Sequence, residues 1–204
     1  PADGAAAPSR AGLLHGDSGA ALLFLRLYER TGDGALLDLA AEALRRDLAR
    51  CVRSAGGTLQ VNEGWRTMPY LGAGSVGIGM VLDDYLAHRP DDAFAAARDE
   101  IVKAAQAKFY AQPGLFRGAA GMVLYLSRTT ATGPGTDAVD LHRQIESLSW
   151  GAVPYQGHLA FAGEQMMRLS MDLSTGTAGC LLALGSALHD SPVHLPFLPP
   201  LRRP

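Results

Sequence analysis

The stretch GLLHGDSGAALLFLRLYERTG, residues 12–32, contains two glycines separated by two residues and then runs into an apolar segment of helical length. Three later segments repeat this order. They are YLGAGSVGIGMVLDDYLAHRP (70–90), GLFRGAAGMVLYLSR (114–128) and LSTGTAGCLLALGSALHD (173–190), and the four glycine pairs are Gly16/Gly19, Gly74/Gly77, Gly118/Gly121 and Gly176/Gly179. Glycines placed in this way indicate a tight loop that enters a helix where backbones approach closely. The chain therefore contains four copies of one unit.

Amphipathic segments separate the four repeats. The segment ALLDLAAEALRRDLARCV (35–52) places Leu37 and Leu44 on one face, and residues 94–110 and 140–153 have the same character. Helices that are apolar all round must be buried on all sides, so we expect inner apolar helices surrounded by outer amphipathic ones. This pattern predicts an all-α fold, an α/α toroid, with repeats starting near residues 12, 70, 114 and 173.

Four repeats form an arc and not a closed ring. An arc exposes an apolar face at each end, and repeat proteins normally cover such faces with a polar cap. Residues 1–12 show no cap, and they read as a loop cut out of a longer protein because the chain does not start with methionine. We therefore expect further N-terminal repeats, in the same polypeptide or in a tightly bound partner.

Four segments interrupt the helical pattern. Residues 56–69 are rich in glycine and β-forming residues, and predict a loop or short hairpin at the rim. Residues 150–165 form a second insertion, with aromatic and histidine residues, and residues 129–138 predict a flexible connection. The tail at 192–204 contains too many prolines to be helical.

The composition excludes several classes of protein. Of the 204 residues, 48% are hydrophobic and 19% charged, and the net charge of −2 indicates no nucleic-acid partner. No apolar run is long enough to span a bilayer, and no signal peptide is present, so we expect a cytoplasmic protein with no membrane partner. Cys51 and Cys180 lie far apart and are predicted to be buried small hydrophobes rather than a disulfide or metal site.

The four loops and their linkers resemble the LanC-like lanthionine cyclases, and most of all the cyclase domains of class III lanthionine synthetases, the actinobacterial lyase–kinase–cyclase proteins. The resemblance rests on GLLHGDSG, EGWRTMPYLGAGSVGIGMVLDDYLAHR, QPGLFRGAAGMVLYL and GHLAFAGEQMMRLSMDLSTGTAG, and covers nearly all of residues 1–204. It implies a toroid of seven inner and seven outer helices, of which this chain supplies the last four pairs, the C-terminal half. It also implies a role in the biosynthesis of lanthipeptides, which are ribosomally made and then modified.

The resemblance also assigns positions to the family's active-site residues. His15, before Gly16, stands where the family has a catalytic histidine. The three zinc ligands of zinc-dependent members are replaced by Gly72, Phe116 and Arg117. Zinc needs three protein ligands and an open position, so we expect no zinc and no other cofactor in this segment. ATP or GTP is expected only in a kinase domain outside the chain.

The family reaction is a Michael addition. A cysteine thiol of the precursor peptide, the expected partner, adds to dehydroalanine or dehydrobutyrine, which forms a C–S bond and gives lanthionine or the carbocyclic labionin. The reaction needs a thiolate, a stabilised enolate and a proton donor. His15 is the candidate acid and base and Arg117 the candidate fixed positive charge. Further candidates to orient or contact the substrate are Asp17, Tyr155, His158 and Asp172.

Other interpretations of these residues stay open. His15 can serve as a cap or a core residue, and Arg117 can cover a carboxylate such as Asp172. The chain can be a non-catalytic module that binds the leader or core peptide within the same synthetase. An α/α-toroid carbohydrate enzyme would need two facing carboxylates. The pairs Asp83/Asp84 and Asp91/Asp92 fall at a helix end and the following turn, which favours solvated or capping roles.

Overall fold

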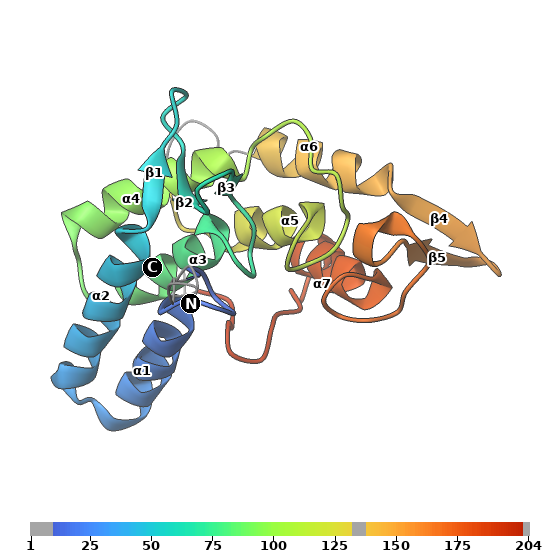
Figure 1. Ribbon diagram of the computed structural model, residues 1–204. Helices are drawn as coiled ribbons and strands as arrows, with labels where there is room; N and C mark the ends of the chain where they lie inside the picture. The colour runs from blue at the N-terminus through green and yellow to red at the C-terminus, as the bar shows by residue number, and fades with distance from the viewer. Residues whose placement is uncertain (1–9, 132–137, 202–204) are drawn as a thin grey trace, which may run out of the picture.

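The computed structural model describes residues 10–131 and 138–201, which are mostly helical (Figure 1). Four helices follow the glycine pairs: α1 (Ser18–Thr31), α3 (Ser75–Leu86), α5 (Ala119–Arg128) and α7 (Thr177–Leu188). Three lie between them: α2 (Gly34–Leu48), α4 (Asp92–Ala104) and α6 (Ala138–Ser149). Two helix types alternate along the chain as predicted. Most of the expected flexible connection, residues 132–137, lies outside the described residues, as do 1–9 and 202–204.

The amphipathic helices end earlier than the sequence pattern indicated, because short strands follow two of them. Strands β1 (Cys51–Arg53), β2 (Leu59–Asn62) and β3 (Thr67–Met68) form an antiparallel sheet, which confirms a hairpin within 56–69. Strands β4 (Ala152–Tyr155) and β5 (His158–Phe161) form a second hairpin. The described residues are therefore mainly, but not entirely, α-helical.

The inner helices differ in how completely they are buried. Every residue of α3 from Ser75 to Tyr85 is buried, whereas α1 exposes Leu23 and Leu27 and α7 exposes Leu181 and Leu188. Figure 1 shows α1 and α2 at one end of the molecule, α3 and α5 in the middle, and α7 with the β4–β5 hairpin at the other end. The helices that bury one face only are thus the two terminal inner helices. None of the helices in the described ranges is both long and apolar enough for a bilayer crossing.

The second glycine of each pair is required by a close approach between backbones. A β-carbon on Gly77, Gly121 or Gly179 would lie 2.2–2.3 Å from the carbonyl oxygen six residues earlier. It would also approach a leucine of the preceding repeat to within 2.7–3.0 Å, and these leucines are Leu13, Leu71 and Leu115 respectively. Since side-chain carbon atoms do not fit at such distances, only glycine allows successive repeats to pack this closely.

Hydrogen bonds join the four glycine loops to one another at equivalent positions. The residue two places before each first glycine donates its N–H to the carbonyl of its counterpart in the next repeat. The bonds run from Leu14 to Gly72 (2.9 Å), from Gly72 to Phe116 (2.8 Å) and from Phe116 to Ser174 (3.1 Å). The loops at the N-terminal ends of the inner helices therefore form one continuous rim.

A buried ion-pair cluster ties the opposite ends of the inner helices to the C-terminal tail. The guanidinium of Arg128 (α5) donates to both carboxylate oxygens of Asp84 (α3), and Arg26 (α1) donates to one of them at 2.8 Å. The same two arginines donate to the tail carbonyls of Phe197 and Pro199. The prediction that Asp83 and Asp84 are solvated or caps is wrong, because both are buried. Asp91 does cap α4, by accepting from the N–H of Phe94.

Candidate functional site

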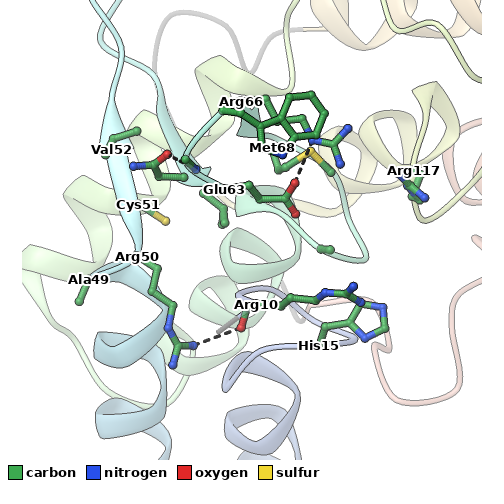
Figure 2. Close-up of a pocket in the computed structure, with 15 residues that line it drawn as sticks. Arg10, His15, Ala49, Arg50, Cys51, Val52, Glu63, Arg66, Met68 and Arg117 are labelled. Atoms are coloured by element: carbon green, nitrogen blue, oxygen red, sulfur yellow. Dashed lines mark hydrogen bonds and ion pairs between the residues drawn. The ribbon is translucent and has the colours of Figure 1, made fainter. Parts of the chain in front are cut away.

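A cavity of about 700 Å³ lies between the rim of glycine loops and the β1–β2–β3 sheet (Figure 2). It brings together parts of three repeats that are distant in sequence. Its polar lining is mostly basic, with Glu63 as the acidic member, and the charged and histidine residues that line it are Arg10, His15, Arg50, Glu63, Arg66 and Arg117. The two predicted catalytic residues, His15 and Arg117, thus line one cavity.

The loop that carries His15 is held by one buried carboxylate. Asp47, at the end of α2, is fully buried and accepts from the N–H groups of Gly12 (3.0 Å), Asp17 (3.0 Å) and Ser18 (2.8 Å), and from the Ser18 hydroxyl (2.6 Å). Four donors on one carboxylate determine the path of residues 12–18, and this path leaves the imidazole exposed at the cavity. The side chain of His15 is therefore free to meet a ligand.

Arg50 forms the wall of the cavity next to this loop. Its Nη1 donates to Asp17 (3.0 Å), to Asp47 (2.8 Å) and to the backbone carbonyl of Arg10 (3.2 Å). Asp17 was predicted to contact substrate, but in the structure its carboxylate is engaged with Arg50. Asp17 therefore helps to fix the side chain of Arg50 in the cavity wall.

Arg117 reaches the cavity from the loop before α5, and Figure 2 places it across the cavity from Arg50 and Cys51. Its side chain is half exposed, and Glu164, in the short 3₁₀ helix Glu164–Met166, lies 3.8 Å away. No hydrogen bond joins Arg117 to Asp172 within the described residues. The alternative that Arg117 covers Asp172 is therefore not what the structure shows.

Gly72 and Phe116, two of the positions expected from the resemblance to have lost zinc ligands, lie close to each other, and Gly72 lies close to Leu14, the neighbour of His15. A β-carbon on Gly72 would lie 3.0 Å from the β-carbon of Phe116 and 3.3 Å from the side chain of Leu14. Phe116 directly precedes Arg117. Among the described residues, no group of three or more His, Cys, Asp or Glu side chains is placed to hold a metal ion.

Of the charged and aromatic residues that line this cavity, sequence reasoning missed Arg10, Arg50, Glu63, Trp65 and Arg66. Trp65 and Arg66 lie in the turn between β2 and β3. The indole of Trp65 is 77% exposed, and the Arg66 guanidinium lies over it at 4.1 Å. The Nε of Arg66 donates to Glu63 at 2.8 Å. A signal was available, because an aromatic–cation pair in the polar segment NEGWR has no place in a core.

Three other predicted site residues lie away from the cavity. Tyr155 and His158 face each other across the β4–β5 turn and are exposed. Asp172 holds the loop before α7, accepting from the Ser170 hydroxyl and from the N–H (2.7 Å) and hydroxyl (2.9 Å) of Thr175. None of these three residues lines the cavity beside His15, so their positions do not support the prediction that they contact a substrate bound there.

The two cysteines are not poised to react. Burial raises the pKa of the Cys51 thiol to about 12, and burial also raises the pKa of Cys180 to about 12. A thiol with such a pKa is almost wholly protonated at neutral pH and is a poor nucleophile. Cys180 is fully buried, in agreement with its predicted role in the core.

Asp172 makes the start of α7 sensitive to acid. The hydrogen bonds from Ser170 and Thr175 lower its pKa to about 2, below the ordinary aspartate value of 3.8. Because the folded-state pKa is the lower one, the stabilisation is complete above about pH 4 and is lost as the pH falls toward 2. We expect the NMR signal of the Thr175 amide to titrate with a midpoint near pH 2. Asp172→Asn should abolish this titration, and a midpoint near 4 would contradict the prediction.

A second cavity, of about 580 Å³, is lined by residues of the loop that precedes α5 and of the C-terminal part of α6. It is lined largely by apolar side chains, several of them highly exposed. Those with the largest exposed fractions are Trp150 (91%), Phe109 (76%) and Met166 (55%). Exposed aromatic and methionine side chains gathered at one cavity are typical of surfaces that bind peptides.

The structure is mostly helical, and its repeated glycine loops line a basic cavity at which His15 is exposed. No family model matches the chain. A protein of Streptomyces coelicolor named "Probable SapB synthase" is 74% identical to it over 195 residues. The match covers 96% of this chain but 21% of that protein, so the chain spans about a fifth of its relative's length.

Proposed function

We propose that this chain is the C-terminal half of a zinc-independent cyclase domain of the class III lanthionine-synthetase type. The observation that carries the proposal is the cavity that both His15 and Arg117 line, in a chain 74% identical to a protein named as a synthase. In this proposal His15 is the acid and base, and Arg117, in place of a zinc ligand, is the fixed positive charge.

Exposed leucines at the first and last inner helices support the proposal that further repeats complete a toroid. Leu71 and Leu115 are fully buried against the glycine of the following repeat, whereas their counterpart Leu173 is 43% exposed. At the other end, Leu23 and Leu27 of α1 are exposed. Further repeats of the same polypeptide would cover both faces.

The proposed reaction uses His15 twice. Its imidazole accepts the proton of a substrate cysteine, and the sulfur bonds to the β-carbon of a dehydroalanine while the double-bond electrons move to the carbonyl as an enolate. The imidazolium then returns the proton to the α-carbon, so protons and electrons balance. Arg117 stabilises the negative charge, first on the thiolate and then on the enolate.

Replacing His15 by asparagine tests this role. The protein to use is a chimaera in which this chain replaces the 195 matched residues of the Streptomyces coelicolor relative. With a dehydrated precursor peptide, we expect ring formation to slow by about a hundredfold or more, since general acid–base catalysis contributes ~10²–10⁴-fold. The measurement is the rate at which cysteine becomes resistant to alkylation, followed by mass spectrometry.

His142→Asn is the matched control, because His142 is 72% exposed on α6 and should leave the rate unchanged. An unchanged rate in His15→Asn would remove His15 from the mechanism. Stoichiometric zinc in the purified protein would overturn the zinc-independent part of the proposal.

A second candidate function is a non-catalytic module that binds the precursor peptide. The exposed side chains of the second cavity, Phe109, Trp150 and Met166, favour it. Peptide binding with no effect of His15→Asn on ring formation would support this candidate. A carbohydrate enzyme gains no support, because Asp83 and Asp84 are buried in ion pairs and Asp91 caps a helix.

A further inference from the structure

The cavity beside His15 carries an excess of positive charge on its surface. Arg10, Arg50, Arg66 and Arg117 line it, against one lining carboxylate, Glu63. The carboxylates that pair with Arg50, those of Asp17 and Asp47, are not among the residues that line the cavity. A group entering the cavity therefore meets mainly cationic donors.

Two of these arginines have little local compensation. Arg10 forms no ion pair within the described part of the chain, and Arg117 has Glu164 at 3.8 Å, beyond hydrogen-bond distance. Arg10 and His15 line the same cavity (Figure 2). Like charges held at one cavity repel each other, and an anion bound between them removes that repulsion.

The position of Arg66 also favours binding of an anion. Its guanidinium is stacked on Trp65 at 4.1 Å, and its Nε donates to Glu63. Its two Nη groups make no hydrogen bond within the described residues. A stacked, planar guanidinium loses little side-chain entropy when it binds a carboxylate or phosphate through two parallel bonds.

We infer that the cavity binds an anionic side chain of the substrate peptide, a carboxylate or a phosphate, through Arg10, Arg66 and Arg117 beside His15. The identification of the ligand as a peptide rests on the proposed function; the preference for negative charge rests on the lining residues. An acidic residue close to the reacting cysteine would then anchor the peptide and bring its thiol to the imidazole.

The test measures binding without turnover. The probe is a short fluorescein-labelled peptide with one cysteine next to two glutamates, and the comparison peptides carry glutamine or phosphoserine instead. We expect the chimaeric protein to bind the glutamate or the phosphoserine peptide at least about tenfold more tightly than the glutamine peptide, because charge-assisted hydrogen bonds are the strong ones. The tighter of the two identifies carboxylate or phosphate as the preferred group, and the preference should shrink as salt is added.

Arg10→Met and Arg66→Met should each reduce the preference severalfold, and the double variant should abolish it. Arg89→Met is the matched control, since Arg89 follows α3 at the far end of the inner helices and pairs with Asp38. Inorganic phosphate should displace the acidic peptides and leave the glutamine peptide bound. Equal affinity for all three peptides, or a preference that survives in the double variant, would overturn the inference.

The outcome for the proposed function is read separately, from ring formation on the dehydrated precursor peptide that is used to test His15→Asn. Equal binding together with normal ring formation would reject the anion site and leave the cyclase proposal standing. A strong preference for acidic peptides without ring formation would support the anion site and reject the cyclase proposal.

Discussion

Replacing Asp47 by asparagine should lower the free energy of unfolding by about 3–5 kcal/mol, the cost of breaking a buried charge network. The carboxylate is fully buried and accepts four hydrogen bonds from residues 12–18 and a further one from Arg50. An asparagine keeps one acceptor oxygen and directs an N–H₂ group at backbone donors. Thermal unfolding followed by far-UV circular dichroism measures the change.

Asp38→Asn is the control, because Asp38 is a 73% exposed partner of Arg89 and should change stability by less than about 1 kcal/mol. Ser18→Ala removes one of the donors to Asp47 and should cost about 1 kcal/mol. A loss in Asp47→Asn no greater than that of Asp38→Asn would show that the network does not hold the loop. The loop of His15 should loosen in parallel, so activity should fall with stability.

Replacing Gly77 by alanine should destabilise the protein by at least about 3 kcal/mol, the upper range for overpacking a core. The added methyl group would lie 2.2 Å from the Leu71 carbonyl oxygen and 2.9 Å from the backbone nitrogen of Leu13. Both of these atoms belong to the backbone, so no side-chain rotation relieves the contacts. The measurement is again the unfolding midpoint, with soluble yield recorded for a variant that fails to fold.

Gly34→Ala provides the comparison for this glycine. No atom lies within 4 Å of a β-carbon on Gly34, which is the first residue of α2. Alanine there should be neutral or stabilise the helix by up to about 1 kcal/mol. If Gly77→Ala proved as stable as Gly34→Ala, the close packing of repeats at the glycine loops would be wrong.

Much of the fold could be predicted because its signals are local. The spacing of Gly74 and Gly77 before an all-apolar run marks the start and burial of α3, and the prolines of the tail exclude a helix there. Helix ends were predicted less well. The amphipathic pattern of 35–52 continues past Leu48, but the backbone leaves the helix and pairs Cys51 with Val61, a contact that depends on a partner strand.

The candidate site divides in the same way. His15 and Arg117 were predicted from the resemblance to the lanthionine cyclases, which assigns roles to the residues directly before the loop glycines. The segment NEGWR marks Trp65 and Arg66 as an exposed aromatic–cation pair, but the sequence does not show that the turn between β2 and β3 lines the same cavity as the loop of His15. Asp47 was missed for a related reason: on the sequence it is one charged residue of an amphipathic helix, and its burial shows only once α2 is packed on α1.

The sequence by itself determined the repeat and the alternation of inner and outer helices, because glycine spacing and apolar periodicity act over a few residues. The tertiary structure decided which loops join through Leu14, Gly72, Phe116 and Ser174, and which arginines surround His15. Those contacts connect residues dozens of positions apart. They depend on how closely neighbouring repeats pack, and the repeats can pack this closely because the loop glycines have no β-carbon.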